Sequence, residues 1–142
     1  MTDALKADAS VFNEINRAQL MDDAHTFAIE GLLDYDSALR TTDYLAQETR
    51  FVPWEVATYA LEYIRDRMYQ DLARVQSFNE RILTVYNSVS GFNQQPTDSL
   101  GTMVTRRLIT RWACNSRLAQ CNTDGAAVYS VWRASANPDT EN

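Results

Sequence analysis

The segment PWEVATYALEYIRDRMYQDLARV, residues 53–75, decides the fold class of this 142-residue chain. Its apolar residues recur at steps of three and four, which is the period of an amphipathic helix. They are Trp54, Ala57, Leu61, Ile64, Met68, Leu72 and Val75. Pro53 suits a first helical turn, because its missing N–H has no partner there in any case. The segment predicts one helix from about residue 53 into the seventies.

The helical period continues upstream of this segment. Residues 18–30 predict a helix with Leu20, Ala24, Phe27 and Ala28 facing inward, and Gly31 ends it. Asp34 or Asp36 can then cap a helix that runs to about residue 47. The residues of that helix expected to face inward are Ala38, Leu39 and Leu45.

Downstream, Phe78, Ile82, Val85 and Val89 predict a helix that stops near Gly91. Residues 90–101 form the one long connection, because turn-forming residues gather there. A helix with Val104, Leu108 and Trp112 follows, and the last runs over about 124–134 before Asn137-Pro138. Six or seven helices with short loops predict an all-α array of antiparallel hairpins. No repeat of fixed period is present.

Composition restricts the class of protein. Hydrophobic residues make up 45% of the chain, with only 4 Gly and 3 Pro, which excludes disordered and collagen-like chains. The length fits one domain or a piece of a larger one. The uncharged stretch 82–97 is too polar and too short to span a membrane. Residues 1–6 lack a basic leader and an apolar core, so no signal peptide is expected.

The charge balance argues against general nucleic-acid binding, because 13 basic and 19 acidic residues give a net charge of −6. Residues 1–73 carry 14 acids and 6 bases, whereas residues 74–142 carry 5 acids and 7 bases. Nearly all the bases are arginines, which suit bidentate contacts with carboxylates. We therefore expect ion pairs across the fold and a solvated surface.

Catalytic machinery is sparse. His25 is the only histidine, so no H-E-x-x-H zinc motif can form, and the usual glycine-rich phosphate loops are absent. His25 is expected to have a structural or surface role. Asp22 and Asp23 are adjacent and would diverge on a helix. No acid, base, cofactor or metal ligand is assigned, and the chain is predicted not to be an enzyme by itself.

The two cysteines leave two interpretations open. On one continuous helix, the Cα atoms of Cys114 and Cys121 would lie about 10 Å apart, beyond the reach of a disulfide. A bridge therefore requires the helix to break, and Asn115-Ser116 could break it. Two free buried thiols are the alternative. A metal site is disfavoured, because two thiolates without a nearby histidine supply too few ligands.

Several motifs in order along the chain resemble a known family. They are Asn16-Arg17-Ala18-Gln19-Leu20, Gly31-Leu32-Leu33-Asp34-Tyr35, Tyr44-Leu45, Glu48-Thr49, Val52-Pro53-Trp54-Glu55, Ala113-Cys114, Cys121 and Tyr129-x-x-Trp132. The combination resembles the start of the C-terminal helical domain of aminopeptidase N-like zinc aminopeptidases, which include endoplasmic reticulum and insect midgut enzymes. The resemblance spans about residues 13–138. One departure is Arg117, where relatives often place a glycine.

The resemblance implies that residues 1–142 form roughly the first half of that helical domain, part of a curved HEAT- or armadillo-like superhelix. It implies a secreted or cell-surface parent enzyme, and hence a Cys114–Cys121 disulfide. The family's zinc belongs to a catalytic domain that precedes this region, so no zinc ligand carries over.

In the family, the helical domain covers the catalytic cleft and limits which peptides enter. The expected partners are the parent's catalytic domain and downstream helices, with peptide as a further candidate. Arg17, Ala18, Gln19, Pro53 and Trp54 are interpreted as maintaining the fold, with peptide contact as the alternative. The other hypothesis for the whole chain is a stand-alone helical module that binds a protein.

The last predicted helix places Val128, Val131 and Trp132 on one face. If the chain is cut midway through a helical array, the face meant for the absent neighbour is left in water. We therefore expect the isolated chain to self-associate through this edge, with Trp132 at its centre.

Overall fold

The computed structural model describes residues 2–68 and 70–135 of the chain, and this part is helical throughout, with no strand. The helices are α1 (Thr2–Ala7), η1 (Ala9–Val11), α2 (Glu14–Ile29), α3 (Tyr35–Arg40), η2 (Leu45–Gln47), α4 (Phe51–Met68), α5 (Leu72–Ser88), α6 (Leu100–Asn115) and α7 (Ala119–Ala134). The predicted all-α class is confirmed. The short elements α1 and η1 were not predicted.

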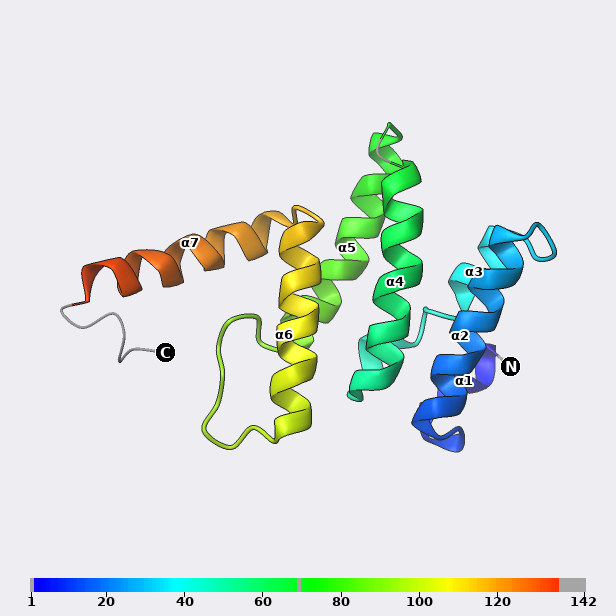
Figure 1. Cartoon of the computed structure of the whole chain (residues 1–142), viewed down its shortest axis with the longest axis horizontal. Helices are drawn as coiled ribbons and strands as arrows, with labels where there is room; N and C mark the ends of the chain where they lie inside the picture. Colours follow the sequence, from blue (N-terminus) through cyan, green and yellow to red (C-terminus); the bar gives the residue numbers. More distant parts are fainter. Residues whose placement is uncertain (1, 69, 136–142) are drawn as a thin grey trace.

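The helices pack in chain order. Helix α2 contacts α3 and α4, α4 contacts α5 and α6, and α6 contacts α7. Figure 1 shows α4 and α6 side by side with α5 behind them, the N-terminal helices at one end, and α7 extending away at the other. Figure 1 also shows that α4 and α6 run in the same direction, because α5 returns the chain between them. The described part is an elongated array.

The helix predicted over residues 53–75 is two helices. Helix α4 ends at Met68, Tyr69 lies outside the described residues, and α5 begins at Leu72. Both helices bury apolar residues in one core, including Trp54 and Leu61 from α4 and Phe78 and Ile82 from α5. The apolar spacing happens to stay in phase across the turn, and no glycine or proline marks it. Period alone therefore carried the first predicted helix past the turn, and α5 combines its end with the helix predicted from Phe78 to near Gly91.

The helix predicted to reach residue 47 stops early. Asp34 is its N-cap, because the Asp34 side chain accepts the backbone N–H of Ser37 at 2.8 Å. Helix α3 ends at Arg40, and the hydroxyls of Thr41 and Thr42 donate to the carbonyls of Ala38 and Leu39 at 2.6 and 2.7 Å. Threonine hydroxyls that take up local carbonyls compete with helix continuation.

Other boundaries also differ from the predictions. Helix α7 starts at Ala119, five residues before the predicted start, and ends at Ala134, so Asn137-Pro138 lies outside the described residues. Gly31 follows α2 with a φ of +73°, as expected for a glycine that ends a helix. Phe27, predicted to face inward, is 49% exposed, and Val104, which the spacing groups with the buried Leu108 and Trp112, is 37% exposed.

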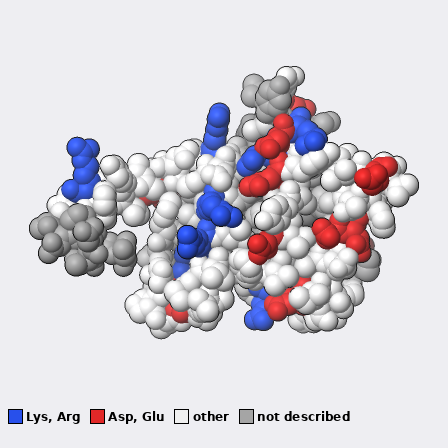
Figure 2. All heavy atoms as spheres, in the orientation of Figure 1, with Lys and Arg blue, Asp and Glu red and all other residues white. Residues whose placement is uncertain are grey.

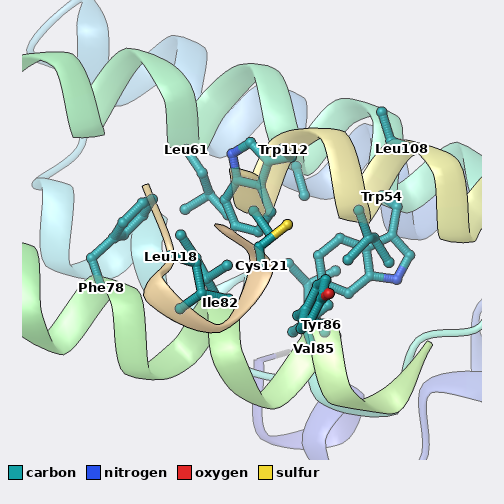
Figure 3. Packing of buried hydrophobic residues seen from close by; sticks show 14 of the residues in the cluster. Trp54, Leu61, Phe78, Ile82, Val85, Tyr86, Leu108, Trp112, Leu118 and Cys121 are labelled. Atoms are coloured by element: carbon teal, nitrogen blue, oxygen red, sulfur yellow. The ribbon is translucent and has the colours of Figure 1, made fainter. Parts of the chain in front are cut away.

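Three aromatic rings hold the centre of the core together, as Figure 3 shows. Trp112 on α6 lies 6.5 Å from Trp54 and 5.9 Å from Phe78, measured between ring centroids, with the Phe78 ring edge-on. Aromatic pairs at these separations add to the free energy gained from burying their area. The contact fixes α4, α5 and α6 against one another.

The connection between α5 and α6 is pinned by Arg106. Its Nε donates to the carbonyl of Val89 at 2.7 Å, and its guanidinium pairs with Asp98. Gly91 adopts a φ of +51°, and a Cβ at this position would lie 2.5 Å from the hydroxyl oxygen of Tyr86. Glycine is therefore required both by the backbone and by the close approach of Tyr86.

Candidate functional site

A buried ion pair organises the N-terminal half of the array. The Nε of Arg17 on α2 lies 2.7 Å from Glu48 Oε2, and Arg17 Nη2 lies 3.1 Å from Glu48 Oε1. The side chains of Arg17 and Glu48 are only 8% and 2% exposed. This is the planar, bidentate geometry that arginine makes with a carboxylate. Hydrogen bonding to Glu48 raises the pKa of Arg17, so the guanidinium stays charged.

Both side chains make further hydrogen bonds to nearby backbone groups. Arg17 Nη1 donates to the carbonyls of Ala9 and Phe12, and Glu48 Oε1 accepts the backbone N–H groups of Thr49 and Arg50. The indole N–H of Trp54 donates to the Glu48 carbonyl at 3.2 Å. One salt bridge thus joins η1, α2, η2 and the start of α4. The arrangement supports the structural interpretation of the Arg17 motif.

The other motif residues divide into buried and exposed ones. Ala18, Pro53 and Trp54 are buried, and Trp54 is 1% exposed. Gln19 is exposed, and its amide donates to Asp23 at 2.7 Å. Gln19 therefore lies outside the Arg17–Glu48 cluster, although it adjoins Arg17 and Ala18 in sequence.

A cleft of about 950 Å³ lies among the described helices. Apolar side chains of α4, α5 and α6 form its wall, among them Trp54, Leu61, Ile64, Phe78, Ile82, Val85 and Trp112. Charged residues stand at its rim, namely Lys6 of α1, Asp36 of α3, Asp43 in the segment after α3, and Arg67 of α4. A mostly apolar cavity of this size with a few charged groups is typical of a ligand or peptide site. Nothing in the apolar spacing of the sequence indicates this cleft.

The Arg17–Glu48 pair and the aromatic contact of Trp112 hold the walls of the cleft in place. Trp54 reaches it from α4, which the Arg17–Glu48 pair anchors through the Glu48 carbonyl. Trp112 reaches it from α6 and carries the aromatic contact to Phe78 on α5. Lys6 at the rim pairs with Asp43 at 2.7 Å, which fastens α1 to the segment that follows α3. The walls are therefore parts of a packed scaffold.

The two cysteines form a disulfide between α6 and α7. Their Cα atoms lie 5.3 Å apart, because α6 ends at Asn115 and the chain turns before α7 begins. The break falls where Asn115-Ser116 was expected to allow it, so the alternative of two free thiols is wrong. The turn places Arg117 at a φ of +59°, the left-handed region that favours glycine. A glycine at position 117 would adopt this backbone conformation without strain.

A hydrogen bond also fastens α7 to α5. The hydroxyl of Tyr86 donates to Asp124 Oδ2 at 2.8 Å. Beyond this point the outer half of α7 is exposed, with Val128 51%, Val131 68% and Trp132 41% exposed. The rings of Tyr129 and Trp132 stack on each other at 5.7 Å. Trp132 therefore lies on an open apolar edge rather than in the core.

His25 is placed as a structural residue. Its ring is buried, and Nδ1 lies 2.8 Å from the carbonyl of Met21. Burial lowers the pKa of His25, although the Met21 carbonyl and Asp22 act in the opposite direction. Across residues 2–68 and 70–135, no three His, Cys, Asp or Glu side chains are grouped so that they could hold a metal ion.

Comparison with known proteins gives a match over the full length of the chain. The family model described as ERAP1-like C-terminal domain matches residues 1–142. The chain belongs to the ERAP1-like C-terminal domain family. This assignment agrees with the aminopeptidase resemblance that the motifs indicated.

Individual members of this family are similar along nearly all of the chain. A glutamyl aminopeptidase of Bitis rhinoceros is 26% identical over 140 residues, which cover 98% of this chain and 15% of that protein. A membrane alanyl aminopeptidase of Manduca sexta is 28% identical over 137 residues, with 94% and 14% covered. One of Heliothis virescens is 30% identical over 133 residues, with 89% and 13% covered. The chain spans about one seventh of the length of these aminopeptidases.

Proposed function

We propose that this chain is a non-catalytic part of the helical domain of a zinc aminopeptidase, and that this domain covers the catalytic cleft and limits which peptides enter. The single observation that carries the proposal is the family match over residues 1–142, combined with the small share of each relative that the chain spans. The relatives are named aminopeptidases, and most of their length lies outside the region matched here.

The residues present do not fit the zinc of such an enzyme. A catalytic zinc site needs three protein ligands and an open position. Here the only histidine is buried and bonded to the Met21 carbonyl, and both cysteines are consumed in the disulfide. No step of peptide hydrolysis is therefore assigned to residues of this chain, and the parent's catalytic domain would supply the metal.

The 950 Å³ cleft supports a role in handling peptides. Its apolar wall would accept hydrophobic side chains. At its rim, the positively charged Arg67 lies over the Tyr63 ring at 3.3 Å. We infer that a peptide on its way to the catalytic domain contacts this cleft. The contact would add affinity for long peptides and nothing for a single aminoacyl group.

The location proposed for the parent is extracellular or at the cell surface. The disulfide fits an oxidising compartment, and two of the relatives are named membrane alanyl aminopeptidases. Within the described ranges, no helix is both long and apolar enough to cross a membrane.

The experiment that tests this role uses the enzyme translated from the complete reading frame. Thr84 is exposed and lines the cleft, so Thr84→Arg should obstruct it without removing a core residue. We expect a fall in kcat/KM for long peptides and no change for an aminoacyl-anilide. Thr123→Arg on the exposed surface of α7 is the matched control. Equal effects of both variants on both substrates would contradict the proposal.

The second candidate is a stand-alone helical module that binds a protein, and the exposed apolar edge of α7 favours it. The two candidates predict different reading frames. If the transcript that contains this chain also encodes an H-E-x-x-H motif upstream, the aminopeptidase proposal holds. A complete transcript without that motif supports the interaction module.

A further inference from the structure

The start of α3 places a tyrosine between two carboxylates on the surface of the molecule. Asp34 directly precedes Tyr35, and Asp36 directly follows it. Tyr35 is 41% exposed, and both aspartates are exposed as well. The packing of the array does not require acids at both positions. An accessible phenol with an acid on either side is a substrate that a tyrosine-modifying enzyme can recognise.

The other tyrosines of the described part lack this combination. They are Tyr44, Tyr59, Tyr63, Tyr86 and Tyr129. Tyr44 and Tyr86 are buried, and Tyr63 is half-buried. Tyr59 and Tyr129 are 70% and 57% exposed, but uncharged residues flank each of them on both sides. Exposure and flanking acids therefore coincide at Tyr35 among the described tyrosines.

The segment around Tyr35 is open to a modifying enzyme. Figure 1 shows the connection between α2 and α3 projecting at the N-terminal end of the array. Leu32 in this connection is 76% exposed, and α3 itself has only six residues. So short a helix gains little stability from its own backbone bonds, and it opens at low cost. An enzyme can therefore take up Tyr35 in an extended conformation.

The charge around Tyr35 favours an enzyme with a basic active site. Residues 1–73 carry 14 acids and 6 bases, and Figure 2 shows acidic groups gathered over the half of the array that contains α2 and α3. Asp36 pairs with Arg40 at 2.8 Å, but their side chains are 74% and 63% exposed, so this pair is easily exchanged. A transferase that holds an anionic donor is basic and would be steered to this segment.

We propose that Tyr35 is a site of O-sulfation. The donor is a nucleoside phosphosulfate: the phenol oxygen of Tyr35 forms a bond to sulfur, the bond from sulfur to the phosphate oxygen of the donor breaks, and a nucleoside bisphosphate leaves. The phenol proton passes to a base of the transferase. The choice of a sulfuryl over a phosphoryl group rests on the proposed extracellular location of the parent protein, which the disulfide supports.

The structure also indicates what the new charge would contact. Tyr35 and Arg67 both line the rim of the cleft, and the Arg67 guanidinium lies 3.3 Å from the centre of the Tyr63 ring. Burial and the Tyr63 hydroxyl raise the pKa of Tyr35, whereas Arg67 lowers it, so the three groups are neighbours. A sulfate on Tyr35 would make charge-assisted hydrogen bonds with Arg67. The modification would thus fasten α3 to the end of α4.

Sulfation of the purified, oxidised chain tests the site. The chain is incubated with a tyrosylprotein sulfotransferase and 3′-phosphoadenylyl sulfate, and mass spectrometry of a digest locates the sulfuryl group. We expect one group on Tyr35 and none in Tyr35→Phe. Asp34→Asn with Asp36→Asn should slow the reaction at least about tenfold, while Asn at position 34 preserves the helix cap. Asp22→Asn with Asp23→Asn makes the same charge change on the exposed surface of α2 and should leave the rate unchanged.

Three results would overturn the proposal. They are no modification at all, modification mainly at Tyr59 or Tyr129, and equal rates for the two pairs of asparagine variants. Chain secreted from cultured cells should carry sulfate on Tyr35, and phosphate at this position would overturn the choice of group. A failed Thr84→Arg test of peptide entry would leave the reaction at Tyr35 unchanged, so failure of this proposal and failure of the proposed function are distinguishable.

Thermal unfolding tests the contact with Arg67. Sulfated chain should unfold about 1–4 °C above unmodified chain, because one new ion pair forms between α3 and α4. Arg67→Gln removes the guanidinium and should abolish this difference. A sulfated chain that gains nothing, or that gains equally in Arg67→Gln, would contradict the pairing of the sulfate with Arg67.

Discussion

Arg17 and Glu48 are 31 residues apart in the chain and form a bidentate salt bridge in which the shorter distance is 2.7 Å. The pair is almost inaccessible to solvent, and it is surrounded by backbone groups that complete its hydrogen bonds. It connects the Arg17-Ala18-Gln19 motif on α2 to the segment that precedes Pro53-Trp54. Two motifs that are separate in the sequence are therefore one structural unit.

Removing one partner of this pair should destabilise the chain strongly. Glu48→Ala leaves the Arg17 guanidinium buried without a counter-charge, which typically costs about 3–5 kcal/mol. Urea denaturation followed by circular dichroism measures the loss. The double variant Arg17→Met with Glu48→Leu should lose less than the sum of the single variants, since no charge stays unpaired. A loss under about 1 kcal/mol for Glu48→Ala would contradict the structural role.

Arg117→Gly should increase stability by about 0.5–1 kcal/mol. The backbone at this position has a φ of +59°, where a side chain is strained and glycine is not. The control is Arg133→Gly, which replaces another exposed arginine but within α7, where glycine is unfavourable. Thermal unfolding compares the two variants. If both variants lose stability equally, the turn does not need a left-handed residue.

Reduction of the Cys114–Cys121 bridge should lower the free energy of unfolding by about 2.5 kcal/mol, on the chain-entropy estimate for a loop of this length. Denaturation with and without reductant measures the difference, and Cys114→Ala with Cys121→Ala provides a variant that reductant cannot affect. A non-reduced digest of oxidised protein should contain the two cysteines in one linked species. Two alkylatable thiols in that material would be inconsistent with the bridge.

Stability should fall as the solution is acidified below about pH 6.5, the ordinary pKa of histidine. Burial lowers the pKa of His25 in the folded chain, so the unfolded chain binds the proton more readily. The contribution is therefore complete above pH 6.5 and is lost as the pH falls through the folded-state pKa. His25→Gln cannot titrate and should flatten the curve between pH 7.5 and about 5.5. An identical pH dependence in both proteins would exclude His25 as the cause.

The isolated chain should also associate through the outer half of α7, where Val128, Val131 and Trp132 are exposed. Burying apolar area drives this contact, so high salt should not dissociate it. Light scattering over a dilution series in high salt should show association that Trp132→Ser reduces. A monodisperse monomer at high concentration, with no change on substitution, would argue against this edge.

Sequence periodicity predicted the helical class and most helices, but it misjudged several boundaries. The stripe from Trp54 to Val75 hid the turn between α4 and α5, because nothing in residues 69–71 interrupts its phase. Helix α3 ended early because two threonine hydroxyls bond nearby carbonyls, a local competition that apolar spacing does not reveal. Phe27 matched an inward position, but no later helix covers it in the described part, and it is 49% exposed.

The candidate site was less predictable than the fold. The resemblance singled out Arg17 and also included Glu48, but pairing them required knowing that η2 returns to α2. The cleft combines α1, α3, α4, α5 and α6, so it depends on packing between distant segments. The disulfide could be inferred only with the family resemblance, since spacing alone left free thiols equally possible. The break between α6 and α7, which the disulfide requires, includes the strained left-handed backbone of Arg117.

The central claim is that this chain contributes structure to an aminopeptidase and performs no hydrolysis itself. The most direct measurement determines the zinc content of the purified chain together with its hydrolysis of aminoacyl-anilides. We predict no stoichiometric zinc and no turnover, because the buried His25 and the bridged cysteines cannot make a three-ligand site. Tight binding of one zinc ion per chain, accompanied by turnover, would contradict the account.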